Sequence, residues 1–129
     1  MRNLFILSII ALIFASCEEY YTFSGIVKNN SNRTVRFYFL NSDTPRKIID
    51  SVAVGAGAEV VIRKQTYAGK KEIGECGAAT FNSLADSVRI KVDTGRILLK
   101  SWKNNDNWTS ETVKFDVNCR FTINQGDIQ

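Results

Sequence analysis

Strict alternation of apolar and polar residues near the end of the chain is the feature that most constrains its fold. Between Glu111 and Ile123, every odd position from 113 onward is apolar and every even position is polar. The apolar set is Val113, Phe115, Val117, Cys119, Phe121 and Ile123. A period of two is typical of a β-strand with one buried face. A strand this long would extend about 43 Å, beyond the usual length, so we expect a bend near Asn118.

A second alternating segment predicts a β-hairpin. Asp86–Asp93 places its apolar residues on one face, and Thr94–Gly95 supplies a turn directly after it. The chain would then return through Arg96–Ser101, where Ile97 and Leu99 share one face. We therefore expect these two segments to pair as neighbouring strands.

The first half of the chain predicts four shorter strands. They cover Phe23–Lys28, Arg33–Leu40, Arg46–Val54 and Glu59–Arg63. The glycines in Gly55–Ala56–Gly57 favour a tight turn, so the third and fourth strands should form a hairpin. Gln65–Phe81 has no clear period and predicts a long loop, Ser83–Ala85 predicts a brief helical turn, and Gln125–Gln129 should fray.

Seven or so short strands joined by turns favour an all-β fold. We expect an antiparallel two-sheet sandwich over residues 23–125, immunoglobulin-like or transthyretin-like. The chain of 129 residues is long enough for one such domain to bury a core.

The N-terminus carries an export signal. The apolar run Leu4–Ala15 has 12 positions, too few for a membrane-spanning helix, which needs about 20. It leads into Phe14–Cys17, which resembles the Leu-(Ala/Ser)-(Gly/Ala)-Cys signal of bacterial lipoproteins, with Phe14 in place of Leu. The resemblance implies a signal peptide of residues 1–16 and lipid, palmitate included, on Cys17. The alternative is a secretory peptide that leaves an ordinary thiol.

Further segments resemble small Bacteroidetes lipoproteins. Glu18–Glu19, within a tether of residues 17–22, is similar to the acidic tag that directs such proteins to the outer leaflet of the outer membrane. Asp86–Arg96 is similar to their D-S-V-x-I-x-F-x-D-G-K hairpin, Trp102 to their Asn/Trp-rich loop, and Phe121–Ile123 to the end of their last strand. The resemblance implies a lipid-anchored β-sandwich, exposed at the cell surface, without catalytic activity.

The three cysteines fall into two classes. If Cys17 carries lipid, Cys76 and Cys119 remain in an oxidising compartment and a disulfide between them is expected. Two separate buried thiols are the alternative. Cys119 shares the register of the apolar set, which indicates a structural cysteine facing the core.

The residue inventory argues against catalysis. Histidine is absent, which excludes Ser/His/Asp and Cys/His mechanisms and imidazole ligation of metals. We find no motif for a nucleophile, metal or cofactor, and predict none of them. The 17 basic and 13 acidic residues are interspersed, which argues against a nucleic-acid partner.

One loop offers a candidate ligand site. Its residues are Trp102, Asn104, Asn105, Asp106 and Trp108. Exposed indoles could stack on sugar faces while the amides bind hydroxyls. The simpler alternative is that Trp102 closes the core and the polar cluster is turn chemistry. A calcium site at Asn104 and Asp106 is a weaker alternative, because the Asp-x-Asp-x-Asp-Gly spacing is missing.

Two serines resemble modification sites. Asp50–Ser51–Val52 and Asp86–Ser87–Val88 are similar to the Asp-(Ser/Thr)-aliphatic motif for O-glycosylation in Bacteroidetes, although both could simply be solvent-facing strand serines. Together these features predict a non-enzymatic protein, held at the outer membrane through Cys17, that serves as a binding or accessory subunit for another envelope protein. The alternative is a surface glycan-binding module that uses Trp102 and Trp108.

Overall fold

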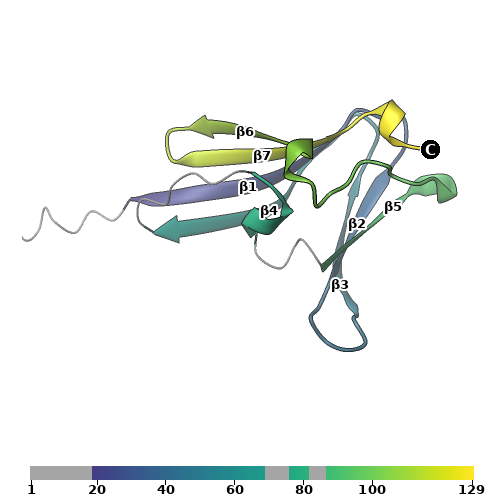
Figure 1. Ribbon diagram of the computed structural model, residues 1–129, viewed down its shortest axis with the longest axis horizontal. Helices are drawn as coiled ribbons and strands as arrows, with labels where there is room; N and C mark the ends of the chain where they lie inside the picture. Colours follow the sequence, from purple (N-terminus) through teal and green to yellow (C-terminus); the bar gives the residue numbers. More distant parts are fainter. Residues whose placement is uncertain (1–18, 69–75, 82–86) are drawn as a thin grey trace, which may run out of the picture.

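The structure, a computed structural model, describes residues 19–68, 76–81 and 87–129. This part of the chain contains seven strands (Figure 1). They are β1 (Tyr20–Asn29), β2 (Val35–Leu40), β3 (Ile48–Val54), β4 (Glu59–Ala68), β5 (Val88–Val92), β6 (Trp108–Val113) and β7 (Asp116–Ile123). Within the same residues, no helix is long and apolar enough to cross a membrane. The predicted lipidation at Cys17 and the predicted turn at Ser83–Ala85 lie outside the described residues.

The strands form two packed sheets, which confirms the predicted sandwich. One sheet has the order β4-β1-β7-β6, and the other has the order β3-β2-β5. Figure 1 shows the second sheet running across the end of the first where β1 finishes. This order differs from a constant-type immunoglobulin domain, whose first two strands share a sheet.

One pair of strands departs from the predicted antiparallel arrangement. The first and last strands, β1 and β7, lie side by side and are parallel, with Phe23 opposite Val117 and Val27 opposite Phe121. A parallel pair needs a long crossover connection. Here the whole chain from β2 to β6 provides it, so this parallel pair is set by the global path of the chain.

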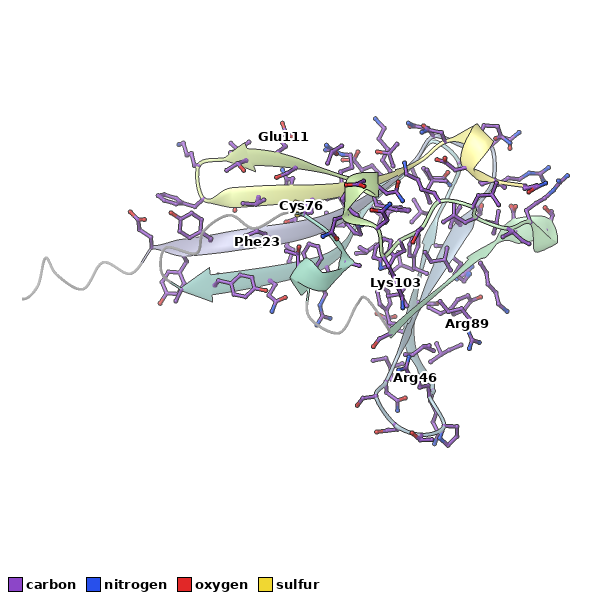
Figure 2. The ribbon with its side chains drawn as sticks, viewed as in Figure 1. Phe23, Arg46, Cys76, Arg89, Lys103 and Glu111 are labelled. Carbon is purple, nitrogen blue, oxygen red and sulfur yellow. A yellow bond between two sulfur atoms is a disulfide. The ribbon has the colours of Figure 1, made fainter. Side chains whose placement is uncertain are left out.

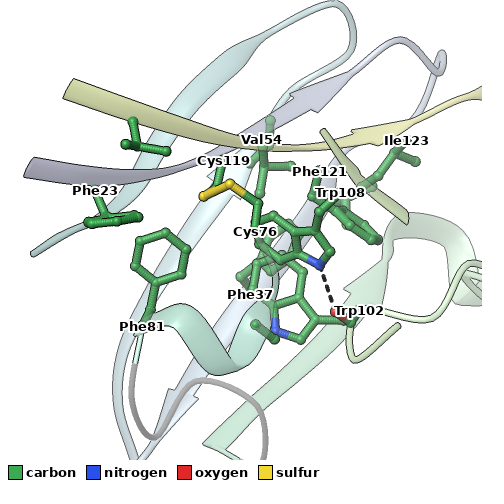
Figure 3. Packing of buried hydrophobic residues seen from close by; sticks show 14 of the residues in the cluster. Phe23, Phe37, Val54, Cys76, Phe81, Trp102, Trp108, Cys119, Phe121 and Ile123 are labelled. Carbon is green, nitrogen blue, oxygen red and sulfur yellow. Dashed lines mark hydrogen bonds between the residues drawn. A yellow bond between two sulfur atoms is a disulfide. The ribbon is translucent and has the colours of Figure 1, made fainter. Parts of the chain in front are cut away.

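The core lies where the two sheets cross. It is built by the inward faces of β1, β2 and β7, together with aromatic residues from the connections (Figure 3). Fully buried members include Val27, Val35, Phe37, Val54, Phe81, Val117, Cys119, Phe121 and Ile123. The alternation predicted for β2 and for the second half of Glu111–Ile123 is therefore confirmed.

The long strand predicted from Glu111 to Ile123 is instead a hairpin of β6 and β7. Lys114 adopts a left-handed conformation (φ 57°) and reverses the chain. The pairing places Thr112 opposite Val117. Even-numbered residues of β6 therefore share a face with odd-numbered residues of β7. The residues that face the core change from even-numbered to odd-numbered positions at the turn. As a result, Val113 and Phe115 are 55% and 47% exposed.

The hairpin predicted between Asp86–Asp93 and Arg96–Ser101 does not form. After a turn at Asp93–Gly95, the chain leaves β5 and pairs with the C-terminal tail. The Ile97 amide donates to the Gln129 carbonyl and the Leu99 amide to the Asp127 carbonyl, each at 2.8 Å. The tail, predicted to fray, is thus part of the domain. Ile97 and Leu99 are mostly exposed, and β5 becomes an edge strand.

The predicted hairpin of the third and fourth strands is also wrong. Gly55–Gly57 carries the chain from one sheet to the other, because β3 pairs with β2 whereas β4 pairs with β1. The buried side chain of Asn29 holds this crossing: its Nδ2 lies 2.9 Å from the Val54 carbonyl and 3.1 Å from that of Gly55. β4 also continues to Ala68, into the predicted loop.

Candidate functional site

The two tryptophans of the predicted ligand loop belong to the core. Trp102 and Trp108 are only 6% and 7% exposed. Their ring centroids lie 4.6 Å apart, and both pack against Phe121. The Trp108 indole N–H donates to the Trp102 carbonyl at 2.9 Å (Figure 3). These rings close the end of the core, as the simpler interpretation of Trp102 predicted, and glycan stacking on exposed indoles loses its basis.

The polar residues between the tryptophans form a capped turn. Asn104 Oδ1 accepts the Asp106 amide at 3.0 Å and caps a short 3-10 turn at Asn105–Asn107. Asn107 Nδ2 donates to the Ser101 carbonyl at 2.8 Å. Among the described residues, no group of three or more Cys, Asp or Glu side chains lies close enough to hold a metal ion. The turn interpretation accounts for Asn104, Asn105 and Asp106.

The predicted disulfide is confirmed. Cys76 and Cys119 are bonded, 43 positions apart in sequence with Cα atoms 5.2 Å apart. Both are buried, and the bond ties the segment before Ala78–Phe81 to the centre of β7 (Figure 3). Burial in the aromatic core gives this pair a structural role.

The two candidate glycosylation serines differ in exposure. Ser51 lies on β3, is exposed, and stands opposite Tyr38 of β2. Ser87 directly precedes β5 and is half-buried. Their O-glycosylation stays a prediction, with Ser51 the more accessible of the two.

A group of cations that the sequence interpretation overlooked lies on the outer face of β2 and β5. The register places Arg36 directly opposite Lys91, and Tyr38 directly opposite Arg89. All three cations are exposed, and Figure 2 shows Arg89 on the side of β5 away from the four-stranded sheet. We call Arg36, Tyr38, Arg89 and Lys91 the cationic face. Within each strand these residues are two positions apart, a spacing in the sequence that indicates a shared face. The total charge of the chain does not show this local arrangement.

Among the described residues, the cations of this face have no carboxylate partner. None of the ion pairs within residues 19–68, 76–81 and 87–129 involves Arg36, Arg89 or Lys91. The Lys91 ammonium lies 5.9 Å from the centroid of the Tyr38 ring, a cation–π distance. The neighbouring Asp93 carboxylate accepts the Thr34 amide at 3.1 Å. Like charges directly opposite one another destabilise a sheet, so this arrangement favours an external anion.

The edge of β5 beside this face is open. Within the described residues, β5 pairs only with β2. The Asp93 amide donates to the carbonyl of Thr34, just before β2, so by alternation the backbone groups of Val88, Ile90 and Val92 point away from β2. These outward donors and acceptors have no strand partner in the part of the chain that the structure describes.

A groove of about 430 Å³ separates β5 from the segment that fails to pair with it. Its lining includes Ile90, Val92, Leu98, Lys91, Arg96 and Lys100. Lys100 already has partners within the domain, since its ammonium donates to the Thr122 carbonyl at 2.8 Å and lies 3.9 Å from the Asp127 carboxylate. Lys91 and Arg96 are exposed and supply positive charge to an otherwise apolar groove.

Comparison with known proteins assigns the chain to no family. No protein-family model matches the chain, and neither does any curated protein or solved structure. Function is therefore inferred from the geometry of the cationic face and from the character of the N-terminal segment.

Proposed function

We propose that this protein is a lipid-anchored, non-enzymatic component of the bacterial cell envelope that binds another envelope protein. The observation that carries the binding role is the cationic face, whose exposed cations have no carboxylate partner among the described residues and lie beside the outer edge of β5. The face lies on two paired strands of the sandwich, which position binding groups more precisely than loops do.

Two features support attachment through Cys17. The chain has three cysteines, and Cys76 and Cys119 are bonded to each other, so Cys17 is the cysteine left for lipid. In addition, Tyr20 starts β1 at the end of the four-stranded sheet away from β5 (Figure 1). An anchor just before Tyr20 would leave the cationic face directed away from the membrane and accessible to a partner.

Intact mass of the protein purified from membranes, with and without reductant, tests the anchor. We expect the mass of residues 17–129 plus acyl groups, and a gain of two hydrogens on reduction. A Cys17→Ser variant should lose the acyl mass and leave the membrane fraction, while keeping the change on reduction. A native protein without acyl mass would contradict the anchor, and further mass would point to glycan at Ser51 or Ser87.

A further inference from the structure

We infer that the cationic face and the open edge of β5 together bind an extended acidic segment of the partner protein. The inference rests on the proposed binding function and adds the chemistry and conformation of what is bound. Its occupant is a strand with alternating acidic and apolar residues.

The charge arrangement selects an acidic partner. Arg36 and Lys91 face each other across the β2–β5 pair, and Arg89 follows on the same face of β5. A carboxylate next to Lys91 would relieve the repulsion between the two opposed cations. Guanidinium groups also bind carboxylates through two parallel hydrogen bonds, so the two arginines suit an acidic side chain better than ammonium groups would.

The open edge selects an extended peptide over a lipid or a sugar. Outward-pointing amides and carbonyls at Val88, Ile90 and Val92 recur every second residue, at about 6.8 Å. A strand added to β5 would match this repeat with its own backbone, as in peptide recognition by strand addition. Its position would then be set by backbone hydrogen bonds, with side chains supplying specificity.

The groove sets the pattern of the occupant. Side chains of an added strand alternate between two faces. Those on the outer face would continue the row of Arg36 and Lys91 and should be acidic. Those on the inner face would enter the groove next to Leu98 and should be apolar. This pattern matches a strand that completes the sheet where Arg96–Ser101 was expected to do so.

The test is an NMR titration of the isotopically labelled, full mature protein in detergent micelles. The probe is a short synthetic peptide of alternating glutamate and valine. We expect amide shifts at Val88, Ile90 and Val92, and binding that weakens as salt is added. Lys91→Glu should weaken binding about tenfold or more. The matched control, Lys64→Glu on exposed β4, changes net charge equally and should leave the affinity unchanged.

Two further probes distinguish a peptide that pairs with the edge from a lipid ligand. The same peptide with every backbone nitrogen N-methylated has no N–H left to donate to the edge, and we expect it not to bind. Equal binding of both peptides, or equal loss in the two lysine variants, would overturn the inference. Phosphatidylglycerol vesicles that bind through Lys91 where the peptide fails would replace it with a lipid ligand. The titration reports on this face whether or not Cys17 carries lipid, so failure of the anchor is seen separately, in the mass.

Discussion

At the scale of single residues, buried hydrogen bonds decide which side chains hold the sandwich together. Asn29 is fully buried at the end of β1. Its Nδ2 shares two protons among the carbonyls of Arg33, Val54 and Gly55, and its Oδ1 accepts the Ser31 amide and hydroxyl. One amide side chain therefore links a polar turn to the crossing between the sheets.

Asn29→Ala should lower the free energy of unfolding by about 3 kcal/mol, because several buried backbone groups lose their partners. Urea denaturation followed by circular dichroism measures this. Asn32→Ala is the control: that side chain is exposed, and its backbone amide, which donates to Gln125, is kept. A similar small loss in both variants would contradict the role given to Asn29.

The two buried tryptophans provide a matched pair. Trp108→Phe removes the hydrogen bond to the Trp102 carbonyl. Trp102→Phe removes an indole N–H that has no hydrogen-bond partner within the part of the chain that the structure describes. We therefore expect Trp108→Phe to be the more destabilising by about 1–2 kcal/mol in urea denaturation. The reverse order would show that ring volume outweighs hydrogen bonding at this end of the core.

At the scale of elements, β5 combines an open edge with opposed like charges. Native sheets often carry charged residues on edge strands, which discourages uncontrolled pairing. Here Lys91 faces Arg36 on the adjacent strand, so the same charges that protect the edge also weaken its pairing with β2. Some stability of this sheet is thus given up for the cationic face.

Lys91→Glu should raise the free energy of unfolding by about 0.5–1 kcal/mol, because it places a carboxylate opposite Arg36. Thermal or urea denaturation at low salt measures the gain, which should shrink as salt is added. Adding Arg36→Glu restores a like-charge pair and should remove the gain, as a double-mutant cycle can show. Additive effects of the two changes would mean that these side chains do not interact.

At the scale of the whole molecule, the disulfide links distant parts of the chain. It closes a loop of 43 positions, which restricts the unfolded chain. The loop contains η1 (Ala78–Phe81), β5, β6 and the crossing that brings β7 beside β1. The bond therefore supports the part of the fold that depends most on long-range pairing.

Replacing both Cys76 and Cys119 by alanine should lower the free energy of unfolding by about 4 kcal/mol in the chain-entropy account. Denaturation of the native protein with reductant should show a comparable loss. The double variant itself should be insensitive to reductant, which serves as the control. A native protein equally stable with and without the bond would contradict this contribution.

Local patterns in the sequence were enough for the strands, the two-sheet class and the inward direction of Cys119, because the period of two decides which side chains share a face. The patterns could not predict the turn between β6 and β7, because the alternation of apolar and polar residues continues across it. They favoured a core position for Trp102 but could not show what covers Trp102 and Trp108, because Phe37 and Phe121 lie on other strands.

By itself, the sequence determined most of the strand content and the pair of cysteines available for a disulfide, and it predicted the export signal. The tertiary structure alone decided which strands became neighbours. Residues 97–99 pair with residues 127–129 and leave β5 open, and β1 lies parallel to β7. The physical reason is that alternation specifies a strand's faces, whereas its edges are filled by competition among distant segments for the same backbone hydrogen bonds. The cationic face lies beside one of the edges that this competition left without a neighbouring strand among the described residues.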